Sequence, residues 1–364
     1  MARRRDIVVL GLSITSSWGN GHATTYRALI KGLGQRGHRV LFLERDQPWY
    51  AAHRDLPQPR FCELGMYDSL EALDRQFAAR VEQAELVILG SYVPDGISVA
   101  QWMLEHARGT TAWYDIDTPI TLAALKRNEC AYLRADLIPE FDLFLTFTGG
   151  PLLERLEQEY GARGAAALYC SVDTDSYYPT SRATRSIDLG YMGTYSVDRQ
   201  PKLDSLLLAP ACAWKSGHFV VVGPGYPAEI EWPPNVARIE HLPPAGHRRF
   251  YNSQRFTLNV TRADMVEVGY APSVRLFEAA ACGVPVISDS WPGLDDLFAP
   301  DQEILLAETP ADVLGFLQDI PETERARIGA RARERVLAAH SGEQRAAELE
   351  QILEALPERG ATAV

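Results

Sequence analysis

The chain has 364 residues, a hydrophobic fraction of 46%, a charged fraction of 23% and a formal net charge of −12. This composition is that of an ordinary soluble globular protein, and the length favours two domains over one. The acidic residues are spread along the chain, which argues against nucleic acid as a ligand because nucleic-acid binders need a concentrated basic surface.

Membrane insertion and metal binding have no support in the sequence. No apolar stretch approaches the roughly 20 residues of a membrane-spanning helix, and residues 7–12 are too few for a signal peptide. A cytoplasmic location is therefore the default, and any membrane association is expected to be peripheral. The five cysteines lie far apart and show no pattern of zinc ligands, so no metal and no cofactor is expected.

The first half of the chain alternates strands with helices. Residues 6–12 (DIVVLGL) form an apolar run typical of a buried strand, and apolar residues recur at helical spacing over 26–33. Further strands are expected from about 39 and at 85–90, 110–115 and 141–147, with helices at 69–83, 97–107 and 150–160. This alternation predicts a parallel, doubly wound α/β domain.

A second α/β series follows a polar, turn-rich segment at 170–186. Strands are expected near 187–192, 218–223, 236–240, 256–260, 284–288 and 303–307, and helices near 199–209, 245–252, 272–282 and 310–319. From about 321 the chain is expected to be a helical tail that can cross back to the first domain. The predicted division is an N-terminal domain at 1–178, a C-terminal domain at 179–340, and a helix and tail at 341–364.

The segment SVRLFEAAACGVPVIS at 273–288 places one carboxylate, Glu278, among apolar and small side chains. A buried ionised group needs a partner. Pro272 suits the first position of the helix that carries Glu278, and the N–H groups at that helix start suit an anion such as a diphosphate. Glu278 lies about 9 Å farther along the axis, where a ribose would follow a diphosphate. The alternative is an ordinary amphipathic-helix residue that faces water.

Residues 278–286 (EAAACGVPV) resemble the EAxxxGxPV signature of GT-B glycosyltransferases, in which the Glu binds the nucleotide ribose. Residues 172–179 (VDTDSYYP) resemble the GVDxxxFxP segment of the retaining, group 1, glycogen-synthase-like branch. More narrowly, PSVRLFEAAACG and YDIDTP resemble the CgeB-like spore maturation group. The resemblance implies the GT-B fold, in which two Rossmann-like domains face each other across a cleft. The first would bind the acceptor and the second a UDP- or dTDP-linked sugar, without a metal.

One departure from the family pattern concerns the donor sugar. The retaining branch has another Glu eight residues before the ribose Glu, where this chain has Tyr270. Either Glu267, three residues away, substitutes from a differently shaped loop, or the sugar is held otherwise.

The leaving diphosphate needs positive charge. Arg199, at the end of GTYSVDR (193–199), and Arg275, in the first turn of the Glu278 helix, are the candidates; each is alternatively a surface ion-pair partner. The expected donor site comprises Gly19, Asn20, Gly21, Gly193, Arg199, Glu267, Tyr270, Pro272, Ser273, Val274, Arg275 and Glu278.

The loop SITSSWGNGH at 13–22 joins the first strand to the first helix. It lacks the GxGxxG fingerprint of dinucleotide-binding domains, but Gly19 and Gly21 would let a ligand approach the backbone. His22 and a second Gly-His at His38 resemble the pattern of inverting GT-B enzymes that use such a His as general base. Neutral imidazole suits proton removal from an acceptor hydroxyl near pH 7. The alternative is a capping or structural histidine.

Asp115 and Asp117, in WYDIDTP at 113–119, follow a strand and are expected at the edge of the sheet where ligands bind. They would orient His22 or bind sugar hydroxyls, and turn capping is the alternative. His22, Asp115 and Asp117 form the expected catalytic group.

The expected activity is transfer of a hexose from a nucleotide sugar to a hydroxyl of a small molecule, glycan or protein. Retention and inversion both stay open, because the linker resembles the retaining branch whereas His22 suits inversion. The alternatives are a nucleotide-sugar 2-epimerase of the same fold, a noncatalytic nucleotide-sugar-binding protein, and a Rossmann dehydrogenase.

Overall fold

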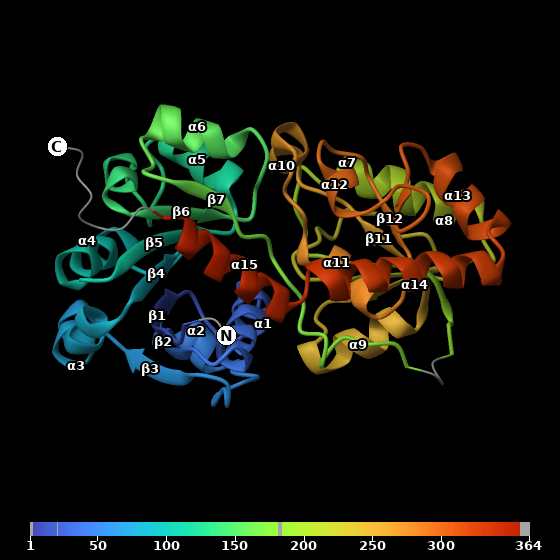
Figure 1. Cartoon of the computed structure of the whole chain (residues 1–364). Helices are drawn as coiled ribbons and strands as arrows, with labels where there is room; N and C mark the ends of the chain where they lie inside the picture. Colours follow the sequence, from blue (N-terminus) through green and yellow to red (C-terminus); the bar gives the residue numbers. More distant parts are fainter. Residues whose placement is uncertain (1–2, 20, 181–183, 357–364) are drawn as a thin grey trace. The chain divides into compact units, whose positions relative to one another are not determined.

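The computed structural model describes residues 3–19, 21–180 and 184–356. The chain divides into two compact units: unit 1 consists of residues 1–16, 22–170 and 342–364, and unit 2 of residues 17–21 and 171–341. The chain thus passes to unit 2 at 170/171 and returns at 341/342, where the sequence placed boundaries at 178/179 and 340/341. Each unit contains one parallel sheet with helices, which confirms the predicted α/β class (Figure 1).

Unit 1 contains a seven-stranded sheet in the order β3-β2-β1-β4-β5-β6-β7. The strands are β1 (Asp6–Gly11), β2 (Arg39–Arg45), β3 (Glu63–Tyr67), β4 (Leu86–Gly90), β5 (Thr110–Asp115), β6 (Leu143–Thr146) and β7 (Ala165–Ala167). The strands of this sheet pair in parallel within the described residues, with Val8 opposite Leu41 on one side and Val87 on the other. The strand order reverses at β1, so the loops after β1 and β4 lie at the switch point where ligands of such sheets bind.

Unit 1 includes the last helix of the chain. Its helices are α1 (His22–Gln35), α2 (Pro48–Ala51), α3 (Leu70–Gln83), α4 (Gly96–His106), α5 (Thr118–Lys126), the 3₁₀ helix η1 (Ala135–Glu140), α6 (Leu152–Tyr160) and α15 (Gly342–Ala355). In Figure 1, α15 runs beside α1. A Cβ on Gly32 would lie 2.2 Å from the carbonyl oxygen of Gly342, so the two helices meet backbone to backbone. The expected return of the C-terminal helix to the first domain is confirmed.

His38 has a structural position in this contact. Its Nε2 lies 2.7 Å from Oε1 of Glu350 on α15, and Arg36 donates to the same carboxylate at 2.6 Å. The Nδ1 atom of His38 accepts from the backbone N–H of Arg5 at 3.1 Å. The second Gly-His therefore ties α15 to the turn before β2.

Unit 2 contains a six-stranded sheet in the order β10-β9-β8-β11-β12-β13. The strands are β8 (Ile187–Met192), β9 (Phe219–Val222), β10 (Val236–Ile239), β11 (Gln254–Asn259), β12 (Val286–Ser288) and β13 (Leu305–Leu306). All overlap the strands expected from the sequence. Here the order reverses at β8, between β9 and β11, so the loops after β8 and β11 are the ones placed for a ligand.

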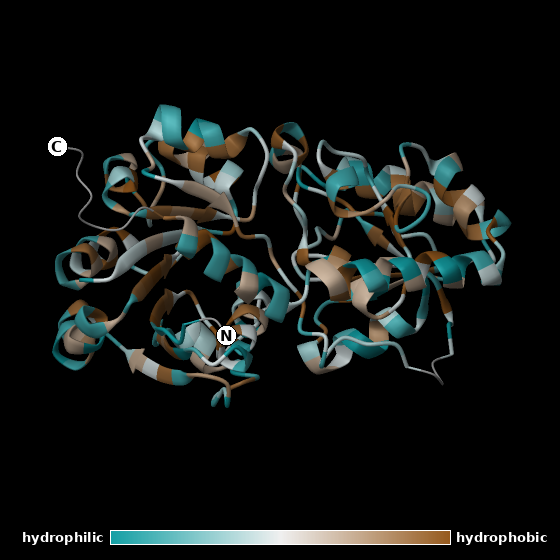
Figure 2. Cartoon of the chain, viewed as in Figure 1, coloured by the Kyte–Doolittle hydropathy of each residue, from teal (hydrophilic) through white to brown (hydrophobic). Residues whose placement is uncertain are grey.

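The helices of unit 2 include the first part of the predicted helical tail. They are α7 (Gln200–Leu203), the π-helix η2 (Asp204–Leu208), α8 (Ala209–Ala213), α9 (Pro244–Asn252), α10 (Ala263–Val268), α11 (Val274–Ala281), α12 (Leu294–Leu297), α13 (Pro310–Asp319) and α14 (Glu322–Ala339). The tail is interrupted at residues 340–341, so α14 stays in unit 2 whereas α15 belongs to unit 1. Figure 2 shows apolar strands in both sheets and mostly polar surfaces on α14 and α15.

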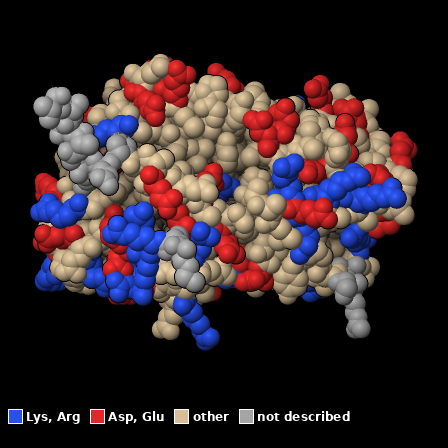
Figure 3. Space-filling model, in the orientation of Figure 1, with Lys and Arg blue, Asp and Glu red and all other residues tan. Residues whose placement is uncertain are grey.

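Within the described residues, no helix has both the length and the apolar character to cross a bilayer. On the face that Figure 3 shows, acidic and basic side chains are interspersed.

Candidate functional site

Glu278 is the fifth residue of α11 and is only 3% exposed. The hydroxyl of Tyr251 donates to its Oε2 at 2.7 Å, and this is the one hydrogen bond to the carboxylate among the described residues. Burial and the nearby carboxylate raise the pKa of Tyr251 well above its usual value, which keeps the phenol protonated and donating. The interpretation of Glu278 as a water-facing residue is therefore wrong.

Arg275 lies on the same helix and is 7% exposed. Its guanidinium donates to three neutral acceptors: the carbonyl oxygen of Met192, Oδ1 of Asn259 at 2.7 Å and Oγ of Ser273 at 3.4 Å. It also lies 4.9 Å from the ring centroid of Tyr191. Within the described residues it forms no ion pair, so the interpretation as a surface ion-pair partner is wrong. A buried cation without a counter-charge is costly unless a ligand supplies the anion.

The start of α11 has no side-chain cap. The helix begins at Val274, with Ser273 as the N-cap residue, so Pro272 lies before the cap and not at the first helical position as predicted. The Ser273 hydroxyl makes no capping bond and instead donates to Asn259 at 2.8 Å. The first-turn N–H groups therefore lack a side-chain cap, which suits an anion.

Tyr270 and Glu267 precede α11. Tyr270 has φ of 51°, in the left-handed region that is strained for a tyrosine, and its N–H donates to the carbonyl oxygen of Pro292 at 2.7 Å. Gly293 allows the tyrosine ring to lie there, because a Cβ on Gly293 would be 2.2 Å from that ring. Glu267 lies on α10 and is exposed. Tyr270 thus has a defined, strained position of its own, whereas the role of Glu267 remains a prediction.

The loops after β8 and β9 approach each other through glycines. A Cβ on Gly223 would lie 2.0 Å from the carbonyl oxygen of Gly193, and a Cβ on Gly193 would lie 3.0 Å from Nη2 of Arg275. A side chain at Gly193 would first meet the hydroxyl of Tyr191, at 2.6 Å, and would also lie close to this guanidinium. Arg199, predicted as a phosphate ligand, lies just before α7 and donates to the carbonyl oxygen of Thr194 at 2.8 Å.

A third arginine, Arg238 on β10, was not expected from the sequence. Its guanidinium carbon lies against two aromatic rings that meet edge to face, 3.9 Å from the centroid of Tyr226 and 4.4 Å from that of Trp232. Burial raises the pKa of Tyr226, and the charges of Arg238, Arg199 and Arg275 each act to lower it, which places all three cations near this phenol. None of the three forms an ion pair within the described residues.

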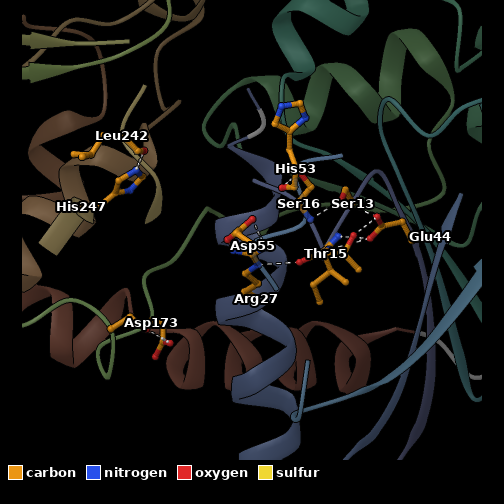
Figure 4. A network of polar contacts seen from close by, with 12 residues as sticks. Ser13, Thr15, Ser16, Arg27, Glu44, His53, Asp55, Asp173, Leu242 and His247 are labelled. Carbon is orange, nitrogen blue, oxygen red and sulfur yellow. Dashed lines mark hydrogen bonds and ion pairs between the residues drawn. The ribbon is translucent and has the colours of Figure 1, made fainter. Parts of the chain in front are cut away.

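In unit 1, the loop after β1 is organised by Glu44, at the end of β2 (Figure 4). The buried carboxylate accepts four hydrogen bonds: from Ser13 Oγ at 2.9 Å, Thr15 Oγ1 at 2.6 Å, and the N–H groups of Ile14 at 2.7 Å and Thr15 at 3.0 Å. In dinucleotide-binding domains an acidic residue near this place binds the ribose. Here the carboxylate is saturated by protein donors, which argues against a dehydrogenase.

The glycines at the tip of the same loop are exposed, and they lie in the segment 17–21 that belongs to unit 2. Gly19 has φ of 57°, and a Cβ on Gly19 or Gly21 would meet no atom within 4 Å. Protein packing therefore does not require glycine at position 21, and the backbone is open to a ligand. Asn20, also predicted here, lies outside the described residues.

His22 begins α1 and lies against Tyr92, with ring centroids 5.2 Å apart in an edge-to-face arrangement. Although the residue keeps some exposed surface, burial of the ring lowers the pKa of His22 to about 3. Tyr92 has φ of 64° and its hydroxyl donates to Oδ2 of Asp117 at 3.2 Å. His22 and Asp117 thus both contact a tyrosine that the sequence analysis did not single out.

Asp115, at the end of β5, is buried, and burial raises its pKa to about 6. Its Oδ1 accepts from the N–H of Asp117 at 3.0 Å, a local turn contact. Asp117 occupies the N-cap position of α5 without making a side-chain cap. Asp115 therefore fits the turn interpretation, whereas Asp117 faces Tyr92.

A cavity of about 570 Å³ lies elsewhere in unit 1, at the amino ends of β1, β2 and β3. Its charged side chains largely satisfy each other, because Arg39 pairs with Asp6 and Arg80 pairs with Glu63 at 2.8 Å. It lies at the opposite ends of these parallel strands from Glu44, so it is not the candidate site. Within the described residues, no group of three or more His, Cys, Asp or Glu side chains is placed to hold a metal ion.

Comparisons with known proteins find a match to one family model over part of the chain and solved structures of similar fold. Residues 199–351 match a family model described as glycosyl transferase-like. A comparison with curated protein sequences found no match. Sucrose-phosphate synthase from Thermosynechococcus elongatus is 15% identical, with a TM-score of 0.64 over 96% of this chain and 98% of the other. HepE from Anabaena, in complex with UDP and glucose, is 13% identical, with a TM-score of 0.70 over 97% and 100%.

The chain has the GT-B fold. A third solved structure of this fold, an alpha-glucosyltransferase in complex with UDP-glucose and DNA containing an abasic site, is 12% identical, with a TM-score of 0.69 over 97% and 100%. The predicted fold is therefore confirmed over both units. At such identities the likeness shows the fold, and the CgeB-like subgroup remains a prediction.

Proposed function

We propose that the chain is a glycosyltransferase that transfers a hexose from a nucleotide sugar to a hydroxyl acceptor. The observation that carries this proposal is the pair of buried charges on α11, Glu278 and Arg275, neither of which has an oppositely charged partner within the described residues. A nucleotide sugar complements both, because ribose hydroxyls donate to a carboxylate and a diphosphate accepts from a guanidinium.

The diphosphate is the leaving group, and its charge grows as the glycosidic bond breaks. We assign its stabilisation to Arg275, to Arg199 and to the uncapped N–H groups at the start of α11. Gly193 keeps the approach to Arg275 clear, and Gly19 and Gly21 offer open backbone. These groups supply positive charge from the chain itself, and metal independence is part of the proposal.

The role proposed for His22 changes in the light of its pKa. A base whose conjugate acid has a pKa of about 3 takes up a proton poorly near neutral pH. We therefore assign to His22 an orienting hydrogen bond to an acceptor or sugar hydroxyl. Asp117, which faces Tyr92, is assigned to a second sugar hydroxyl.

The donor is proposed to be UDP-linked, since the solved structures of HepE and of the alpha-glucosyltransferase contain UDP or UDP-glucose. One observation favours a second candidate, a nucleotide-sugar-binding protein without transferase activity. Tyr270 stands where the retaining branch has a Glu, and its strained backbone and packing against Gly293 show that the loop is built around a tyrosine.

A ligand screen followed by a turnover assay tests the proposal. Thermal shifts with UDP, dTDP, GDP and their glucose conjugates identify the nucleotide, and release of nucleotide diphosphate is then measured across hydroxyl acceptors with and without a chelator. We expect binding of UDP and UDP-glucose, and acceptor-dependent release that the chelator does not change. Binding without release would favour the noncatalytic candidate, isomerised donor without acceptor would favour a 2-epimerase, and no binding of any nucleotide would contradict the proposal.

A further inference from the structure

Asn259 holds the buried guanidinium of Arg275 from the end of β11. It is 0% exposed, and its Oδ1 accepts from Nη1 of Arg275 at 2.7 Å and from Oγ of Ser273 at 2.8 Å. The carbonyl oxygen of Met192 accepts from Nε of the same arginine. The oxygens of Asn259 and Met192 therefore orient the guanidinium plane, and because both are neutral they do not compensate its positive charge.

The orientation of Asn259 is itself determined. Its Nδ2 donates to Oγ1 of Thr261 at 3.2 Å and to Oγ of Ser288 at 2.9 Å, so both donors and both acceptor positions of the amide are used. A flipped amide would present donors to Arg275 and Ser273 and lose these bonds. The amide oxygen is therefore held toward Arg275.

The same network connects Asn259 to a buried acid, Asp289, through hydroxyl groups. Asp289 accepts from the N–H of Thr261 at 3.1 Å and from its Oγ1 at 2.9 Å, and Ser288 lies beside it. Thr261 and Ser288 are thus the contacts that Asn259 and Asp289 share. Two side chains therefore separate the Asp289 carboxylate from the guanidinium: Asn259, and then Thr261 or Ser288.

We propose that Asn259 sets the charge of the anion-binding position at the start of α11, by positioning Arg275 without neutralising it. An aspartate at position 259 has the same shape and would accept the same bond from Nη1, but it would form an ion pair and use up the cation. Asn259 is therefore a residue that determines specificity for the doubly charged diphosphate. This inference rests on the proposed function, in which Arg275 binds the diphosphate of the donor.

The test compares Asn259→Asp with the wild type, using UDP, inorganic pyrophosphate and uridine as probes in calorimetry. We expect Asn259→Asp to lower the affinities for UDP and pyrophosphate by about 10- to 100-fold, the range of one hydrogen bond to a charged group. The affinity for uridine should stay within about twofold, because uridine carries no phosphate. An unchanged UDP affinity, or equal losses for UDP and uridine, would overturn the inference.

Two further comparisons separate charge from folding. Gln254→Glu also adds a buried carboxylate on β11, at its other end, and should leave the ratio of UDP to uridine affinity unchanged. Where Asn259→Asp does not fold, Ser273→Asp brings a carboxylate to Arg275 from the N-cap position, which accepts aspartate readily, and Ser273→Asn is its neutral control. The UDP affinity of Ser273→Asp should lie about 10-fold or more below that of Ser273→Asn, and equal affinities of the two variants would overturn the inference. Absence of nucleotide binding by the wild type would instead refute the proposed function.

Discussion

The loops at the carboxyl ends of the two sheets use buried charge in different ways. In unit 1, Glu44 is saturated by four hydrogen bonds from its own loop. In unit 2, Arg275 and Glu278 are buried with neutral partners alone among the described residues. The difference indicates that Glu44 has a structural role, because it stabilises its own loop. Arg275 and Glu278 still have hydrogen-bonding capacity that a ligand can use. Substitutions should therefore lower stability in unit 1 and ligand affinity in unit 2.

The largest effect is expected at Glu44. Glu44→Ala leaves two buried N–H groups and two hydroxyls without their acceptor and should lower the free energy of unfolding by about 3–5 kcal/mol, the typical cost of breaking a buried charge network. Urea denaturation measures this. Glu63→Ala, an exposed acid on the neighbouring strand, is the control and should cost less than about 1 kcal/mol. Equal losses of unfolding free energy in Glu44→Ala and Glu63→Ala would contradict the structural role of Glu44.

Arg275→Gln should give the opposite result. Its UDP affinity should fall by about 100-fold, because a charge-assisted bond to the diphosphate is lost. Its stability should be retained or rise, since removing an uncompensated buried cation relieves a desolvation cost. Calorimetric titration measures the UDP affinity, and thermal unfolding of the same sample measures the stability. A large loss of stability with unchanged affinity would assign Arg275 to the fold.

Asp115→Asn sharpens the comparison within unit 1 through pH. The pKa of Asp115 is raised to about 6 in the folded state from 3.8, so its contribution to stability is fully present below about pH 3.8 and is lost as pH rises through 6. The asparagine variant lacks this loss. It should match the wild type near pH 4 and exceed it by about 3 kcal/mol near pH 8, at roughly 1.4 kcal/mol per pH unit. If the unfolding free energies of the wild type and Asp115→Asn differed by the same amount at every pH, the raised pKa of Asp115 would be refuted.

The smallest effect is expected for Tyr251→Phe in unit 2. The phenol donates the one hydrogen bond to Glu278 within the described residues, so its loss should leave the carboxylate less well oriented. We expect UDP affinity to fall by about 10-fold, which corresponds to the low end of the range for one hydrogen bond to a charged group. Tyr177→Phe is the control, because the hydroxyl of Tyr177 contacts His247 and not Glu278. Equal affinities of the two variants would contradict the orienting role.

Sequence patterns located most of the fold because buried parallel strands are continuous apolar runs. They missed β3, whose five residues include Glu63 and Gly65, and β7, which has three alanines. Gly65 belongs in its strand because its neighbours Leu43 and Phe77 leave no room for a Cβ, a tertiary reason that no local pattern contains.

The residues of the candidate site also fall into two groups, those that the sequence predicted and those that it missed. Glu278 and Arg275 were predictable because both lie on one helix with a recognisable signature. Arg238, Tyr92 and Asn259 were not singled out, because their surroundings come from segments distant in the chain. The positive φ at Tyr92 and the contact of Arg238 with two aromatic rings exist only after folding.

The most direct measurement of the central claim compares UDP with 2′,3′-dideoxy-UDP, which lacks both ribose hydroxyls, on the wild type and on Glu278→Gln. The wild type should prefer UDP by at least about 10-fold, and the variant should lose most of that preference while it still binds the diphosphate. Glu267→Gln, exposed on α10, should keep the wild-type ratio. An equal preference for UDP in the wild type and Glu278→Gln would show that this carboxylate does not bind the ribose.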